Sequence, residues 1–217
     1  TKADVTSLEK LSDVASVQGI YAKDELIEPV ARTTTRQEND ETAIAKVIGV
    51  PKQLNKITLV KGQLPQKDNE IVVEEAYLKK NKVKIGDSLK MNDPDLTNET
   101  YQIVGTVKSP LYFSKVHRGT TSLGDGRIDY FMYVRPSVFK QDVYSAIALT
   151  VKGAKQEMTS QTAYLDRISA AKKEVETIKK AQETQRFETV YADYLSPAAL
   201  ASGQVNRDSL PPAKWYI

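Results

Sequence analysis

The stretch of sequence that decides the fold is Asn69-Glu-Ile-Val-Val-Glu-Glu-Ala-Tyr-Leu-Lys-Lys. Its apolar run is typical of a short buried strand, and residues 74–81 have the composition of a helix. Gly62-Gln-Leu-Pro before it predicts a turn. Ile85-Gly-Asp-Ser-Leu after it predicts a sharp turn into a strand, because Gly tolerates positive φ and Asp caps a turn with its side chain. Tyr101-Gln-Ile-Val-Gly-Thr-Val then adds a partner strand, and nothing in the whole phrase is typical of a catalytic site.

The residues before this phrase predict one helix and several strands. Val5, Leu8 and Leu11 recur at helical spacing, with Thr6 or Asp4 as the expected cap. The remaining elements are expected as strands over residues 15–22, 27–33, 43–50 and 57–62, with a polar loop at 36–42. Pro29 places its strand at an edge or a bulge, since proline cannot donate to a sheet ladder.

The residues after the phrase predict a long loop, two strands and a helix. Residues 109–129 are irregular and rich in Gly, Ser and Thr, which in an ordered domain is typical of a functional surface or flap. Strands are expected over 130–134 and 146–153, and a helix over 160–186. One side of that helix has heptad spacing, which fits either an amphipathic helix covering a sheet or the root of a coiled coil. This seam comprises Tyr164, Ile168, Ala171, Val175, Ile178 and Gln182.

Composition excludes several classes of protein. The chain has 217 residues, 40% of them hydrophobic, which is enough for one good core or two small ones. Its net charge of +3 comes from intermixed Lys, Arg, Asp and Glu, so no nucleic-acid partner is expected. The absence of Cys excludes disulfides and thiol chemistry. No apolar run reaches the length of a membrane span, and the first residue is Thr, so we expect a segment of a longer protein.

Residues that could carry chemistry are sparse. The single histidine, His117, is expected to be an incidental surface residue. The acidic residues at 93–99 resemble the start of a calcium loop but lack its Gly and its final Glu. Glu74 and Glu75 are adjacent on a helix, face different ways and are expected to be ordinary surface charges. No catalytic residue, metal site or cofactor is therefore predicted.

Aromatic residues around the long loop are a different kind of feature. Tyr112 and Phe113 lie at its start, and Tyr130, Phe131 and Tyr133 alternate in the strand that follows. Most of these side chains are expected in the core, because aromatic residues in a strand bury well. Those that border the loop could form an exposed patch for a protein, peptide or lipid partner.

Taken in order, these segments resemble a known family. The phrase from Gly62 to Val107 is similar to the extracytoplasmic core domain of FtsX-like (MacB-type) ABC transporter permeases. Ser109-Pro-Leu-Tyr-Phe-Ser, Arg118-Gly-Thr-Thr-Ser-Leu-Gly-Asp-Gly-Arg and Tyr130-Phe-Met-Tyr-Val resemble more narrowly the large permeases of Gram-positive bacteria. The order and spacing of the motifs carry the resemblance, which extends over nearly the whole chain.

The resemblance implies an α+β fold built from two subdomains. Residues 1–56 and 135–190 would form a membrane-proximal α/β subdomain, and 57–134 an inserted, mainly β subdomain. Residues 191–217 would be a linker toward the next transmembrane helix. The domain would lie on the extracellular side of the cell membrane, between the first two transmembrane helices of a multi-pass protein. Relatives with an extended coiled coil differ from this chain, whose helix at 160–186 is short.

The resemblance also implies a function without catalysis. ATP binding and hydrolysis would occur in a separate cytoplasmic ATPase subunit, and this domain would couple that hydrolysis to export or sensing of a peptide, lipid or cell-wall partner. The predicted contact residues are Tyr112, Phe113, Arg118 and Tyr130. The alternative from another class is a secreted or cell-surface adhesion or scaffold module. A hydrolase is a third hypothesis, and the scarcity of residues that could carry catalysis argues against it.

Overall fold

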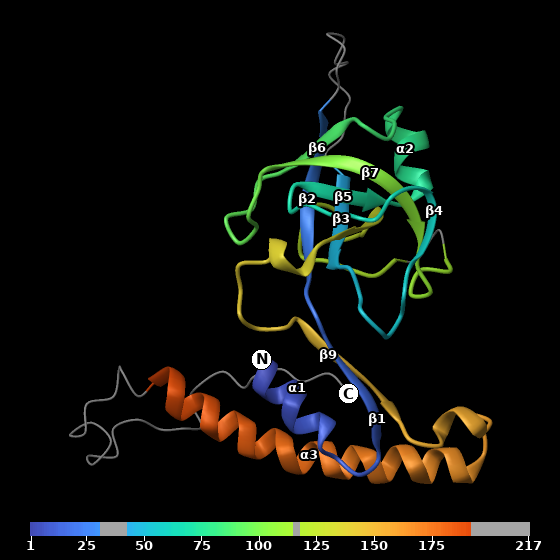
Figure 1. Ribbon diagram of the computed structural model, residues 1–217, viewed down its shortest axis with the longest axis vertical. Coiled ribbons are helices and arrows are strands. Elements are labelled where there is room, and N and C mark those ends of the chain that lie inside the picture. Colours follow the sequence, from blue (N-terminus) through green and yellow to red (C-terminus); the bar gives the residue numbers. More distant parts are fainter. Residues whose placement is uncertain (31–42, 115–117, 192–217) are drawn as a thin grey trace. The chain divides into compact units, whose positions relative to one another are not determined.

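The computed structural model describes residues 1–30, 43–114 and 118–191. The predicted loop at 36–42, His117 and the predicted linker beyond residue 191 lie outside these residues. The chain divides into two compact units, of which unit 1 combines residues 1–17 with the chain from 149 onward and unit 2 comprises residues 18–148. Figure 1 shows the elements of both units in chain order by colour.

Unit 2 is a curled β-sheet. Its strands are β2 (Ala22–Val30), β3 (Ala43–Gly49), β4 (Thr58–Gly62), β5 (Glu70–Val73), β6 (Ser88–Met91), β7 (Thr100–Lys108) and β8 (Tyr130–Val134). They are ordered β4-β7-β5-β8-β3-β2-β6, and β6 pairs back with β7. The sheet thereby closes on itself into a barrel, with β4 added beside the second half of β7 (Figure 1).

The barrel has an interior core and a second apolar cluster on its outer face. Ile71 and Val73 belong to the interior core, whereas Val72 between them belongs to the outer cluster. Side chains alternate between the two faces of a strand, so a strand buried on both sides reads as a continuous apolar run. This explains why the strand predicted from Ile-Val-Val has no polar position. The outer cluster also contains Phe131 and Tyr133 and is covered in part by Tyr112.

Pro29 lies on β2, opposite Leu89 of β6. Among the described residues, β2 pairs with β3 from Ala22 to Ile27 and with β6 from Ile27 to Val30. Residues 31–42 lie outside the described ranges, so the expected edge or bulge position of Pro29 stays a prediction.

Unit 1 is built from helices at the two ends of the described chain. It contains α1 (Lys2–Glu9), the short helix η2 (Ala154–Gln156) and α3 (Thr162–Tyr191). Ala171 and Val175 of α3 are buried, as is Leu8 of α1, and the other positions of the heptad seam are half-buried. Gln182 donates to Ser7 Oγ at 3.2 Å. The seam therefore packs within unit 1, as expected of an amphipathic helix.

The cap of α1 differs from the expected one. The N-cap is Thr1, whose side chain accepts from the Asp4 backbone N–H while the Asp4 carboxylate bonds back to Thr1. This reciprocal capping box satisfies two N–H groups that a helix start leaves unpaired. Asp4 thus takes part in the cap as its third helical residue, and Thr6 instead donates to the Lys2 carbonyl at 3.0 Å.

Two strands connect the units. β1 (Val14–Ile20) and β9 (Ala146–Val151) pair in a separate two-stranded sheet, and the division between the units falls within both strands. A further short helix, η1 (Pro136–Val138), follows β8. Ser16 and Thr150 hydroxyls lie 2.6 Å apart across the sheet in unit 1.

The division of the chain therefore falls elsewhere than the predicted boundaries at 56/57 and 134/135. A cut there would separate β2 and β3 from β6 and β8, with which they share ladder hydrogen bonds. Local sequence patterns identified these strands but carry no information on which distant strand each pairs with. Unit 1 is still assembled from both ends of the chain, and the α+β class is confirmed. Within the described ranges, no helix has both the length and the apolar character that crossing a bilayer requires.

Helix α2 (Glu75–Asn81) ends at an unusual residue. Its C-cap, Lys82, has φ 52° and ψ 33°, a left-handed conformation in which Gly is favoured because it has no Cβ. We expect Lys82→Gly to raise the free energy of unfolding by about 1 kcal/mol. Lys79→Gly, inside the same helix, should lower it by about 1 kcal/mol. Urea unfolding of both variants tests this, and a loss of stability in Lys82→Gly would contradict it.

Candidate contact surface

The segment that follows β7 is fixed to the outer face of the barrel by Tyr112. Its ring stacks on Phe131 of β8, with ring centroids 4.7 Å apart and planes at 8°. Burial raises the pKa of the Tyr112 hydroxyl well above its ordinary value. Offset stacking and apolar burial together hold such a ring in place. Tyr112 is therefore mainly a support for the segment that carries it.

A buried hydroxyl pair holds the start of the same segment. Ser109 Oγ and Tyr133 Oη lie 2.7 Å apart, and both residues are buried. The Leu111 backbone N–H donates to Ser109 Oγ at 3.3 Å. A buried hydroxyl that lacked a partner would cost free energy, so this pair favours one position of the segment over others.

Arg118 lies in a buried ion pair. Its guanidinium contacts Glu74 Oε1, and the side chains of the two residues are 7% and 8% exposed. The same carboxylate oxygen accepts from the Phe131 backbone N–H at 3.3 Å, and the guanidinium carbon lies 5.6 Å from the Phe131 ring centroid. Burial raises the pKa of Glu74, and Arg118 opposes that effect. The expectation that Glu74 is a surface charge is wrong, because its side chain is directed into this site.

Tyr130 lies inside the barrel. It is 4% exposed and meets Tyr77 edge to face, with ring centroids 5.1 Å apart. Asn81 Nδ2 donates to its hydroxyl at 3.4 Å. These contacts connect β8 to helix α2. Tyr130 is therefore too buried to touch a partner directly, and any effect of it on binding would be indirect, through its packing against Tyr77 and Asn81.

Phe113 is the one predicted contact residue with a largely exposed side chain. It is 89% exposed, and Leu111, two residues earlier, is 51% exposed. Tyr112, between these two residues, packs against the barrel, whereas its two neighbours are exposed. Leu111 was not among the predicted contact residues. No sequence pattern distinguished it, because Leu111, Tyr112 and Phe113 are all apolar and lie after the end of β7.

The acidic loop after β6 does not form an ion site. Lys23 Nζ contacts the carboxylate of Asp93 and lies 2.7 Å from Asp95 Oδ2. The protein's own ammonium group thus occupies the place that a cation would take. Across the described parts of the chain, no cluster of three or more His, Asp or Glu side chains could hold a metal ion.

Comparison with known proteins gives distant structural likenesses. No protein-family model matches the sequence, and no curated protein matches it. The chain is similar to the extracellular domain of the noncanonical ABC-type transporter YknZ from Gram-positive bacteria. The two share 15% sequence identity over 72% of this chain and 75% of that one, with a TM-score of 0.45. It is also similar to the periplasmic region of MacB from Actinobacillus actinomycetemcomitans, with 15% identity, coverage of 84% and 82%, and a TM-score of 0.43.

A third similar structure is a domain assigned to a permease protein from Porphyromonas gingivalis. It shares 9% identity over 68% of this chain and 66% of that one, with a TM-score of 0.41. At these identities and TM-scores no residue of this chain takes a role from its neighbours.

Proposed function

We propose that this chain is the non-catalytic extracytoplasmic domain of an ABC transporter permease of the FtsX-like, MacB type. It would lie on the extracellular side of the cell membrane, in a multi-pass protein that works with a separate cytoplasmic ATPase subunit. The resemblance of the sequence over nearly the whole chain supports this proposal.

The observation that carries a binding role is the exposure of Leu111 and Phe113 on a fixed base. Large apolar side chains that project from an anchored segment are typical of sites where a partner is bound. Tyr112 and Ser109 fix the segment to the barrel through Phe131 and Tyr133. Binding of a partner to Leu111 and Phe113 would therefore cost little conformational entropy. The partner would present an apolar group, as a peptide, a lipid or a lipid-linked cell-wall component does.

Two results are expected for the full-length protein that contains this chain. It should co-purify with a separate ATPase, and a photo-crosslinking amino acid in place of Phe113 should give an adduct in cells. Leu111→Ser should weaken that adduct, because burial of one such side chain contributes about 1.5 kcal/mol, or roughly tenfold in affinity. Mass spectrometry of the adduct would identify its chemical class.

The control is the same crosslinker in place of Leu165, which is 56% exposed on α3. Equal adducts at both positions would contradict a specific contact surface. A full-length protein that purifies without an ATPase would contradict the permease assignment. If that protein also carried a cell-wall anchor, it would be an adhesion or scaffold module.

A further inference from the structure

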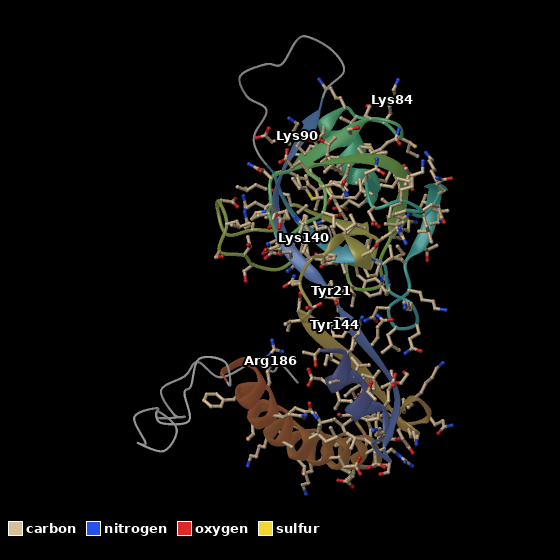
Figure 2. All side chains as sticks on the ribbon, turned by 60° about the vertical axis from the view of Figure 1, so that its left-hand side comes forward. Tyr21, Lys84, Lys90, Lys140, Tyr144 and Arg186 are labelled. Carbon is tan, nitrogen blue, oxygen red and sulfur yellow. The ribbon has the colours of Figure 1, made fainter. Side chains whose placement is uncertain are left out.

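A lysine-rich surface lies at one end of the barrel, around the end of helix α2 and strand β6. Five lysines occur between positions 79 and 90, and Asp87 is the single acid in that interval. They come from the end of α2, the turn that follows and strand β6, and all five are exposed. Figure 2 shows Lys84 and Lys90 at this end of unit 2. We call this set the lysine surface; its members are Lys79, Lys80, Lys82, Lys84 and Lys90.

Among the described residues, three of the five lysines of the lysine surface form no ion pair. Lys79 lies 3.5 Å from Glu75, while Lys80 lies over the Tyr130 ring at 5.9 Å. In the part of the chain that the structure describes, Lys82, Lys84 and Lys90 have no ion pair. Asp87 accepts the Lys84 backbone N–H at 2.9 Å and so stabilises the turn, and Glu28 of β2 is the cross-strand neighbour of Lys90. By contrast, Arg118, Arg127 and Arg135 of unit 2 all pair with carboxylates.

The lysine surface stands on a rigid base. Strand β6 pairs with β2 on one side and with β7 on the other, and its Leu89 and Met91 are fully buried. Tyr77 anchors α2 with no exposed surface. Five exposed positive charges are thus carried by two well-anchored elements and the turn between them. A negatively charged partner would be attracted to this surface.

The side-chain chemistry indicates the kind of anion. The set contains lysine and no arginine, and an ammonium is a point charge that binds phosphate without the planar geometry of a guanidinium–carboxylate pair. No aromatic residue is exposed between positions 79 and 90, so stacking on nucleobases is not provided. Ile85, 37% exposed, is the single exposed apolar side chain there, which is too little for insertion into a bilayer.

We infer that the lysine surface binds an extended phosphodiester polymer through its phosphates, without reading the units between them. Binding of this kind releases counterions and weakens steeply as salt increases. The inference does not depend on the contact role of Leu111 and Phe113, and it concerns unit 2 alone.

The test uses the complete chain and purified poly(glycerol phosphate) at several salt concentrations. The triple variant Lys82→Gly, Lys84→Gln, Lys90→Gln should bind at least about tenfold more weakly at low salt. The slope of log affinity against log salt should shrink by about 2, or about 0.7 for each lost contact. Because Lys82→Gly is expected to stabilise α2, loss of binding with retained melting temperature separates binding from folding.

The matched control removes three exposed lysines elsewhere on unit 2, with Lys52→Gln, Lys56→Gln and Lys67→Gln. Equal weakening by both triple variants would show that net charge alone is responsible and would overturn the inference. So would failure of the unaltered chain to bind at low salt. Stronger binding to polyglutamate, or to vesicles of phosphatidylglycerol, would also overturn it, in favour of an acidic protein or a lipid surface.

Discussion

Replacing Arg118 with methionine is expected to lower the free energy of unfolding by about 3–5 kcal/mol. The Arg118 and Glu74 side chains are almost fully buried, and their contact is the main compensation for the charge of the Glu74 carboxylate. Methionine would fill much of the space of arginine but would leave that carboxylate buried without its cation. Breaking one side of a buried pair costs far more than the pair itself contributes.

A double variant separates this explanation from loss of packing. Glu74→Gln combined with Arg118→Met removes both charges, and the glutamine oxygen can still accept the Phe131 backbone N–H. We expect the double variant to recover most of the lost stability. Arg127→Met is the matched control, since Arg127 pairs with Asp125 at the surface and its side chain is 79% exposed.

Urea unfolding of the four proteins checks the prediction. Loss of a surface pair such as that of Arg127 costs about 0–1 kcal/mol. If Arg118→Met and Arg127→Met cost the same, or if the double variant is no more stable than Arg118→Met, the buried pair does not have the assigned role. Arg118 is also unsuitable for mapping a partner, because its loss would disturb the segment that carries Phe113.

Residues 69–91 show how far the sequence alone could lead. Strand β5, helix α2, the turn at Gly86 and strand β6 all lie where periodicity and turn chemistry predicted them. These are local properties, determined by residues within a few positions of each other. The parallel pairing of β5 with β7 and of β3 with β8 joins distant segments, and no local pattern specifies it.

Glu74 and Glu75 show the same limit at the level of the site. Both are carboxylates at the start of one helix, yet Glu74 is buried against Arg118 and Glu75 lies at the surface near Lys79. Their environments differ because Arg118, which follows β7 in the chain, contacts Glu74 and not Glu75. Phe113 was predicted together with Tyr112 as an aromatic residue at the start of the long loop, and the sequence did not show that one of the two is buried and the other exposed.

Glu25 is a second buried carboxyl that the sequence does not distinguish from its neighbours. It lies on β2, is 6% exposed, and its Oε1 has no hydrogen-bond partner while Lys23 Nζ is 3.9 Å away. Burial, followed by a hydrogen bond with Asp93 and the negative charges of Asp93 and Asp24, raises the pKa of Glu25 from 4.5 to about 8. Tyr101 of β7 also lies within electrostatic reach.

The pKa of Asp93 changes in the opposite direction. Burial acts to raise it, but the hydrogen bonds from Glu25 and Lys23 outweigh that effect and lower the pKa from 3.8 to about 2. Over most of the range between these values, Glu25 holds the proton and donates it to the Asp93 carboxylate. In this range Glu25 is therefore neutral and Asp93 is negatively charged, with Lys23 as the counterion of Asp93.

Stability should consequently fall as pH rises from about 4.5 to about 8. In that window the folded Glu25 is still protonated whereas the unfolded one is not, so unfolding releases a proton and becomes easier at higher pH. The stability that Glu25 contributes is fully present below 4.5 and is lost as the pH approaches 8. Asp93 acts below this window, where its contribution is lost as pH falls from 3.8 toward 2.

Glu25→Gln should remove most of this dependence. The glutamine amide can donate to Asp93 at any pH, so the variant is expected to match the unaltered chain at pH 5 and to exceed it at pH 8 by a few kcal/mol, since each pKa unit corresponds to about 1.4 kcal/mol. Glu99→Gln removes an exposed acid from the loop that carries Asp93, and this variant should keep the pH dependence of the unaltered chain. Urea unfolding at pH 5, 6.5 and 8 measures the differences. Parallel curves for the unaltered chain and Glu25→Gln would show that Glu25 does not keep its proton in the folded barrel.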